Sequence, residues 1–237
     1  MAVSFPPQEL DCPDPAGCPV LATLPALNTV ELSSGRALFR VYDSRRGHDE
    51  HNPGSGDARF SPFDDPRTGV RIPTMYLADD PKSALLETAF HEVHHAASRT
   101  VYEADLVGKL LVYLRVPEAA LLGDLRDDEL RRLGIAREQV VSSVAEHYPC
   151  TRRLAAQALG RSHRGGDIQG LLWHSRQAEL AGAPSAEVLV LFGSHYQSKR
   201  GSWHLVEPGI RNLYEGPGRL LIDEIADDID AVILAAV

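Results

Sequence analysis

Six residues of types that bind anions or stabilise charge stand out in the sequence: Arg40, Arg59, Tyr76, Glu87, Ser175 and Arg176. Arg40 and Tyr76 interrupt apolar strand patterns, and an unpaired charge buried there would be costly. Glu87 lies between the apolar pairs Leu85-Leu86 and Ala89-Phe90, so its side chain need not be fully exposed to solvent. A guanidinium holds phosphate oxygens through paired, charge-assisted hydrogen bonds, and a carboxylate stabilises positive charge. The set indicates a pocket for an anion, although each residue alone also fits a position on a strand edge, a helix surface or a turn.

A histidine cluster, His91-Glu92-Val93-His94-His95, satisfies the HExxH pattern. On a helix, His91 and His95 would share one face, as in a zinc hydrolase, with Glu92 as the base. The expected helix is short, and no third ligand follows at a spacing such as HxxGxxH. A polar helix end, where histidines interact well with the helix dipole, explains the cluster better. We therefore expect no metal ligands.

The glycine-rich segment 160–170, GRSHRGGDIQG, suggests a phosphate loop at first sight. It lacks the GxxxxGK[ST] spacing, and it precedes an expected strand, whereas a phosphate loop follows one. We interpret it as an ordinary connection between a helix and a strand.

Composition and charge limit the classes of function. The 237 residues include 24 Lys and Arg against 33 Asp and Glu, which gives a net charge of −9. Non-specific nucleic-acid binding derives largely from Lys and Arg, so we expect no direct binding to nucleic acid. No segment approaches the ~20 apolar residues that span a bilayer, and the N-terminus lacks the basic region of a signal peptide. The three cysteines, Cys12, Cys18 and Cys150, include no CxxC pair, so we expect a reduced, cytoplasmic protein without a zinc knuckle or a disulfide framework.

The elements that must position these residues form a mixed α/β pattern. The expected strands are 38–42, 75–78, 102–106, 109–116, 170–175 and 187–192, and the expected helices are 82–95, 117–133, 151–159 and 220–234. Asp80 before Pro81 predicts where the first helix begins. The loop 48–71 is long enough to be functional. We divide the chain into an N-terminal extension (1–34), one domain (35–219) and a C-terminal amphipathic segment (220–237).

Several short motifs, in this order, make the sequence resemble the RES-domain family, which is named for an arginine, a glutamate and a serine. The matching stretches are Leu38-Phe39-Arg40-Val41, His51-Asn52-Pro53 with Arg59-Phe60, Tyr76-Leu77-Ala78 with Ala84-Leu85-Leu86-Glu87, and Gly170-Leu171-Leu172-Trp173-His174-Ser175-Arg176. The chain departs from the family at His51, where phenylalanine is usual, and at Ala58, where glycine is usual. Both departures lie in the long loop.

The resemblance implies an ADP-ribosyltransferase-like fold with a split β-sheet core, flanking helices and an NAD-binding cleft. It implies a toxin of a type II toxin–antitoxin pair that consumes NAD as substrate, by hydrolysis or phosphorolysis, with no further cofactor. The expected partners are an Xre-type helix-turn-helix antitoxin and a second copy in a homodimer. The alternatives are an ADP-ribosyltransferase with a protein acceptor, a zinc hydrolase and a non-catalytic binding module.

The same resemblance implies roles for individual residues, with Arg40, Glu87 and Ser175 as the catalytic set. The residues expected to bind NAD are Arg40, Arg59, Tyr76, Ser175 and Arg176. The arginines would hold the pyrophosphate, and Tyr76 would offer an aromatic face to nicotinamide. Glu87 would stabilise positive charge on the ribose. Ser175 would donate to nicotinamide or ribose and would not act as a nucleophile, because no His or Asp partner is indicated.

Overall fold

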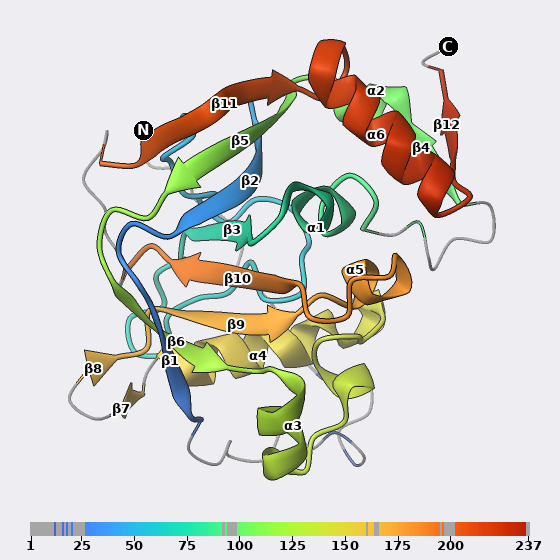
Figure 1. The fold of residues 1–237 in the computed structure, drawn as a ribbon. Coiled ribbons are helices and arrows are strands. Elements are labelled where there is room, and N and C mark those ends of the chain that lie inside the picture. The colour runs from blue at the N-terminus through green and yellow to red at the C-terminus, as the bar shows by residue number, and fades with distance from the viewer. Residues whose placement is uncertain are drawn as a thin grey trace.

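The computed structural model describes residues 12, 16, 18, 20, 27–91, 93, 99–159, 161–163, 166–194, 196 and 202–235. An eight-stranded sheet runs through the molecule (Figure 1). Its strands, in spatial order, are β1 (Thr29–Leu32), β6 (Ala120–Asp124), β9 (Gly170–His174), β10 (Glu187–Phe192), β3 (Thr74–Ala78), β2 (Ala37–Asp43), β5 (Lys109–Arg115) and β11 (His204–Asn212). β6 and β9 are parallel, and the other neighbouring pairs are antiparallel.

Helices and two small strand pairs surround this sheet. The helices are α1 (Pro81–Leu86), α2 (Glu103–Leu106), α3 (Asp127–Leu133), α4 (Tyr148–Leu159), α5 (Arg176–Leu180) and α6 (Gly216–Asp228), with 3-10 turns at Arg137–Gln139 and Ala145–His147. β12 (Val232–Leu234) pairs in parallel with β4 (Thr100–Tyr102), and β7 (Ser162–His163) pairs with β8 (Gly166–Asp167). Among the described residues, no helix is long and apolar enough to cross a membrane.

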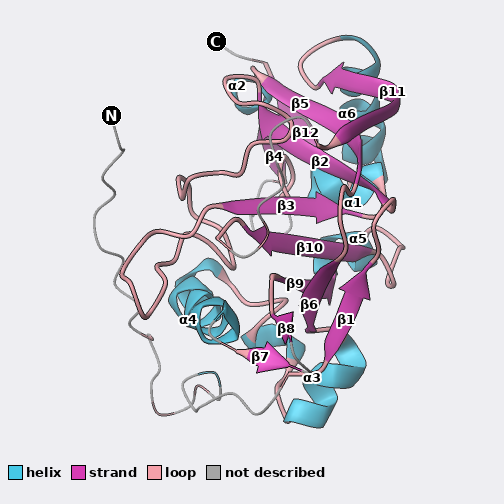
Figure 2. Cartoon of the chain, turned by 90° about the vertical axis from the view of Figure 1, so that its left-hand side faces the viewer, coloured by secondary structure: helices cyan, strands magenta, loops and turns pink. Residues whose placement is uncertain are grey.

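The two faces of the sheet bury different apolar clusters. The larger cluster joins the sheet to α1, α4 and α6, which contribute residues such as Leu85, Leu154 and Ile222. The smaller cluster lies on the other face and includes Leu38, Leu77 and Trp203. Figure 2 shows α4 beside the part of the sheet that contains β9. The central strands β9 and β10 are therefore apolar on both faces, because each face is covered.

The sheet divides between β2 and β3. These strands share a single register pair, Phe39 with Ala78, whereas β2 pairs with β5 along its whole length. Beyond Phe39 the two strands diverge, and Figure 1 shows β2, β5 and β11 inclined to β3, β10 and β9. The expected α/β class with a split sheet and flanking helices is confirmed, and the split opens a gap in the middle of the sheet.

Most expected strands and one expected helix match the structure closely. The predictions at 38–42, 75–78, 109–116, 170–175 and 187–192 correspond to β2, β3, β5, β9 and β10, and the helix at 151–159 corresponds to α4. Asp80 caps α1 by accepting from the Ser83 N–H at 2.9 Å, with Pro81 in the first turn, as expected. The first residue of β9 is Gly170, and only glycine fits there, because a Cβ would lie 2.2 Å from the Val190 carbonyl oxygen.

Four element predictions were wrong. The helix expected at 82–95 ends at Leu86, where the i→i−4 pattern stops: the N–H groups of Thr88 and Phe90 both donate to the Leu85 carbonyl, and Phe90 is buried in the core. The strand expected at 102–106 is the end of β4 followed by α2. The helix expected at 117–133 contains β6, which pairs with β1 and β9, before α3 begins. The helix expected at 220–234 is α6, which ends at Asp228 and is followed by β12.

The division into three segments stays a prediction. The structure shows, however, that both expected extensions contain secondary structure. β1 lies inside the segment expected as an N-terminal extension and pairs with β6 at the edge of the main sheet. The last turns of α6 and all of β12 lie inside the segment expected as C-terminal. β1, α6 and β12 therefore belong to the described fold together with the expected domain.

Candidate active site

A cavity of about 400 Å³ opens where β2 and β3 diverge. Its walls come from β2, the 48–71 loop, β3, the segment after α1, and β9. A second recess of about 850 Å³ shares residues such as Asp43, Thr88 and His91 with the cavity and extends to β4 and α2. Cavities of a few hundred Å³ with convergent polar groups are typical of small-molecule sites.

Glu87 and Ser175 meet at the inner end of this cavity. Glu87 is the C-cap of α1, directly after its last residue Leu86, and it lines the cavity. Ser175 is fully buried, and its Oγ donates to Glu87 Oε1 at 2.6 Å while accepting from the Ala178 N–H at 3.0 Å. The serine is thus the N-cap of α5 and holds the carboxylate at the same time. Among the described residues, Ser175 is the one hydrogen-bond donor to this carboxylate.

Aromatic residues form the floor beside Glu87. Tyr76 and Phe60 each contact the buried Trp173 edge-on, with ring centroids 6.2 and 4.9 Å apart. The Tyr76 hydroxyl accepts from the Phe60 N–H at 3.1 Å and lies 3.2 Å from the Ser61 Oγ. Burial raises the pKa of Tyr76 to about 12, so its hydroxyl stays neutral. The phenol therefore fixes the long loop against β3 while its ring lines the cavity.

Arg59 is a buried cation in the cavity wall. Its side chain is 4% exposed, and Nη1 donates to the Val140 carbonyl at 3.0 Å and to the Ser143 carbonyl and hydroxyl at 2.9 and 2.8 Å. The guanidinium also lies over the Tyr148 ring, 5.4 Å from its centroid. No ion pair joins Arg59 to a described carboxylate, so its charge is available to an anion in the cavity.

Arg40 binds the long loop from inside the protein. Strand alternation places it on the face of Leu38 and Tyr42, opposite to the face of Tyr76. Its guanidinium donates to the carbonyls of His48 and Glu50 and lies 5.5 Å from the Tyr42 ring centroid. Burial lowers its pKa to about 10, which keeps it charged at neutral pH. Arg40 also lines the cavity, where β2 and β3 diverge. Two of its N–H groups are already used in the hydrogen bonds to the loop.

Several residues that line the cavity carry a buried polar atom without a hydrogen-bond partner among the described residues. Examples are Nε of Arg59, Nε1 of Trp173 and Oγ1 of Thr74. Buried polar groups are nearly always hydrogen-bonded, so such exceptions require an explanation. A polar ligand in the cavity would provide their partners.

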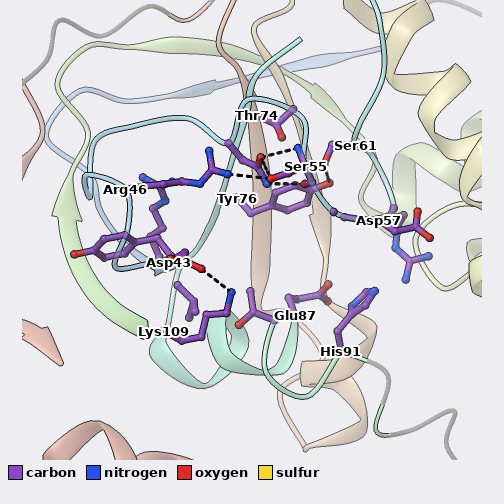
Figure 3. Close-up of a pocket in the computed structure, with 18 of the residues that line it drawn as sticks. Asp43, Arg46, Ser55, Asp57, Ser61, Thr74, Tyr76, Glu87, His91 and Lys109 are labelled. Atoms are coloured by element: carbon purple, nitrogen blue, oxygen red, sulfur yellow. Dashed lines mark hydrogen bonds and ion pairs between the residues drawn. The ribbon is translucent and has the colours of Figure 1, made fainter. Parts of the chain in front are cut away.

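The outer rim carries positive charge. Arg45, Arg46 and Lys109 line the cavity, and Figure 3 shows Arg46 across the pocket from Glu87 and His91. Arg45 and Lys109 both contact Asp43, and the hydrogen bonds from Arg45 hold the pKa of this carboxyl well below its usual range. Arg46 donates to the Ser55 Oγ at 3.0 Å and pairs with no described carboxylate. Its charge is thus the least compensated on the rim.

Most of the histidine cluster lies outside the described residues, which include only His91 and Val93 of it. α1 ends five residues before His91, and Glu92, His94 and His95 lie outside the described residues. His91 lines the cavity, where its Nε2 lies 2.6 Å from the Tyr148 hydroxyl. The expectation that this segment ends a helix was wrong, because α1 has already ended.

Five of the six expected site residues gather at the cavity, and Arg176 does not. Arg40, Arg59, Tyr76 and Glu87 line it, and Ser175 contacts Glu87 from behind. Arg176 donates to the Ser142 carbonyl at 3.0 Å and is not among the lining residues. The binding and catalytic roles of all six stay predictions.

Sequence reasoning missed other cavity residues. These are Asp43, Arg45, Arg46, Asn52, Ser55, Asp57, Thr74, Thr88, His91, Lys109 and Trp173. The adjacent Arg45-Arg46 pair at the end of a strand was an available signal for the rim. Trp173 lies in one of the motifs of the resemblance, but its unpartnered N–H depends on the packing around it and has no sequence signal.

Two comparisons bear on the fold and on the family. A family model described as the RES domain matches residues 36–202. The fold is similar to that of a chain in the crystal structure of the M. tuberculosis MbcT–MbcA toxin–antitoxin complex, with a TM-score of 0.57 and 15% identity over 88% of this chain and 97% of that chain. No curated protein matched the sequence.

Proposed function

The chain belongs to the RES-domain family, and we propose that it is the toxin of a toxin–antitoxin pair and cleaves the nicotinamide–ribose bond of NAD. The observation that carries this proposal is the Glu87 carboxylate, held at 2.6 Å by buried Ser175 inside a cavity with cationic walls. A carboxylate within reach of a bound dinucleotide suits chemistry in which positive charge develops on a sugar.

The charges of the cavity fit a dinucleotide that carries a pyrophosphate. Arg46 at the rim and Arg59 in the wall supply cationic donors that no described carboxylate neutralises. Arginine holds phosphate oxygens in a planar, charge-assisted geometry. The cavity and the adjoining recess together give a dinucleotide an extended path from the rim to Glu87.

The aromatic floor and the unpartnered polar atoms fit the nicotinamide end of the substrate. The rings of Tyr76 and Trp173 lie close to Glu87, so a planar pyridinium would bind against an apolar surface there. The Trp173 N–H and the Thr74 hydroxyl have no described partner, and both could bond to an amide.

Bond cleavage in this arrangement follows from the charges. The C–N bond between ribose and nicotinamide breaks, and its electron pair neutralises the cationic ring nitrogen, so the leaving group needs no proton. The ribose carbon gains oxocarbenium character, which the Glu87 carboxylate stabilises, as carboxylates do in glycoside cleavage. Water then bonds to that carbon and releases one proton to the solvent, or an anionic phosphate oxygen bonds to the carbon directly. Ser175 acts as a positioning residue, because it fixes one carboxylate oxygen and leaves the other to the substrate.

The antitoxin part of the proposal rests on the family and on the similarity to a chain of the MbcT–MbcA complex. A toxin of this kind needs a partner that suppresses it, and the resemblance suggests an Xre-type protein. We expect expression of the chain alone to arrest growth and to lower cellular NAD. Co-expression with an Xre-type antitoxin that binds the chain should restore both.

Product analysis tests the reaction directly. Purified protein is incubated with NAD, with and without phosphate, and the products are identified by mass spectrometry. Nicotinamide with ADP-ribose indicates hydrolysis, nicotinamide with ADP-ribose-1″-phosphate indicates phosphorolysis, and a mass gain on protein indicates ADP-ribosyl transfer. We expect one of the first two results. Intact NAD after incubation with folded, antitoxin-free protein would contradict the proposal.

A further inference from the structure

The three cysteines of the chain come together although they are far apart in sequence. Cys12 and Cys18 lie in the N-terminal segment, and Cys150 is the third residue of α4. Their sulfur atoms all lie within 4.8 Å of one another. Cys150 is 1% exposed, and the other two are partly buried against the larger apolar cluster. No CxxC pair in the sequence indicates this cluster.

We propose that Cys12, Cys18 and Cys150 form a structural zinc site, separate from the NAD cavity. In a tetrahedral site, Zn–S bonds of about 2.3 Å place the sulfurs about 3.8 Å apart. Three sulfurs within 4.8 Å of one another need to contract only slightly to reach that geometry. The fourth position would take a water molecule or another donor.

The surroundings of Cys150 favour a metal-bound thiolate over a reactive free thiol. Cys150 is 1% exposed and packs inside the larger apolar cluster, so it is poorly placed to react with solutes as a free thiol. Zinc displaces thiol protons when it binds. The first turn of the twelve-residue helix α4 then places its partial positive charge beside the new thiolate.

A disulfide explains the trio less well. It would join two sulfurs and leave the third as an unpaired thiol against the core. A bond of about 2.05 Å also demands a larger movement than the metal site does. Disulfides are rare in the reducing compartment that the sequence predicts, where cysteine clusters are more often metal sites.

The site would connect the N-terminal segment to the wall of the NAD cavity. Next to Cys150, Thr151 donates to the Arg59 carbonyl, and Tyr148 lies against the Arg59 guanidinium and bonds to His91. In the N-terminal segment, Val20 is fully buried. Zinc would thus stabilise the part of α4 that holds Arg59, without touching substrate.

Cobalt substitution and metal analysis test the site without an activity assay. The full chain, purified under reducing conditions without chelator, should hold about one equivalent of zinc by elemental analysis. After removal of the metal, Co²⁺ should give a thiolate charge-transfer band and tetrahedral d–d bands that saturate at one equivalent. Zn²⁺ should displace the cobalt and raise the Tm of the metal-free protein.

Serine variants identify the ligands. Cys12→Ser and Cys18→Ser, which alter partly exposed positions, should weaken zinc binding by more than about 100-fold, since loss of a ligand exceeds the usual effect of an outer-shell change. Cys150→Ser should act in the same direction, and because it alters the core, the other two variants decide the question. The control is Arg153→Ser, an exposed position on the same helix, which should bind zinc like the wild type. Zinc below stoichiometry with no cobalt–thiolate band in folded protein would overturn the proposal, as would an intact mass that shows a disulfide in reductant-purified protein.

Discussion

The hydroxyl of Ser175 donates a 2.6 Å hydrogen bond to the carboxylate of Glu87, a residue 88 positions away in the chain. The same hydroxyl caps α5, so the start of one helix orients the C-cap residue of another. Because Ser175 is fully buried, this contact fixes the carboxylate from behind and leaves its cavity side to a substrate.

Removing that hydroxyl should impair turnover more than stability. We expect Ser175→Ala to lower kcat for NAD cleavage by about 10- to 100-fold, because a hydrogen bond to a charged group contributes about 1.5–3 kcal/mol. Loss of the N-cap should reduce the free energy of unfolding by about 1 kcal/mol. Ile222→Val, a core change in α6 of similar cost, serves as the control and should keep full kcat. A wild-type kcat in Ser175→Ala would show that Glu87 needs no such support.

Arg46 should contribute to substrate binding and not to the chemical step. Its charge faces the cavity without a described carboxylate partner, so Arg46→Gln should raise KM for NAD about fivefold and leave kcat unchanged. The salt dependence of KM should also weaken. Steady-state kinetics at two ionic strengths measure both effects. The control is Arg131→Gln, at an exposed position of α3. A fall in kcat with unchanged KM would assign Arg46 a different role.

His51 should make the protein sensitive to acid. Burial, and then the charge of Arg40, lower the pKa of His51 to about 4, and its buried Nε2 has no hydrogen-bond partner among the described residues. The unfolded chain, with a His pKa of about 6.5, binds one proton more between these values, so the free energy of unfolding falls as the pH drops from about 6.5 to about 4. Above pH 6.5 this contribution is fully present.

The variant His51→Phe, which carries the residue usual in the family, tests that effect. It binds no proton, so its stability relative to the wild type should improve on the order of 1 kcal/mol between pH 7.5 and pH 5. Urea unfolding at the two pH values measures the difference, and the exposed His204→Phe is the control. An equal difference at both pH values would mean that His51 is not the acid-sensitive group.

The local sequence pattern predicted those elements whose conformation does not depend on pairing with distant parts of the chain. β2, β3 and β10 combine β-branched or aromatic residues with turn residues at their ends, and α1 begins where Asp80 and Pro81 predict. β6 was missed because Ala120-Leu121-Leu122 also suits a helix, and pairing with β1 and β9 decides its conformation. The early end of α1 was missed for a related reason, since it depends on the burial of Phe90.

The site residues that belong to sequence motifs could be predicted. The features of the site that arise from tertiary packing could not. Arg40, Arg59, Tyr76 and Glu87 were singled out from the sequence, and all four line one cavity. The cavity itself depends on the divergence of β2 from β3, which no local pattern records. The unpartnered Trp173 N–H and the cysteine trio are likewise consequences of tertiary structure.

NAD turnover by Glu87→Gln is the most direct test, because the substitution keeps the size of the side chain and one acceptor oxygen while it removes the negative charge. We expect kcat to fall by at least about 100- to 1000-fold, as when preorganised electrostatic stabilisation is lost, with the Tm and the affinity for NAD little changed. Glu224→Gln, an exposed position on α6, should retain full activity. Wild-type turnover by folded Glu87→Gln would contradict the assignment of this carboxylate to the reaction.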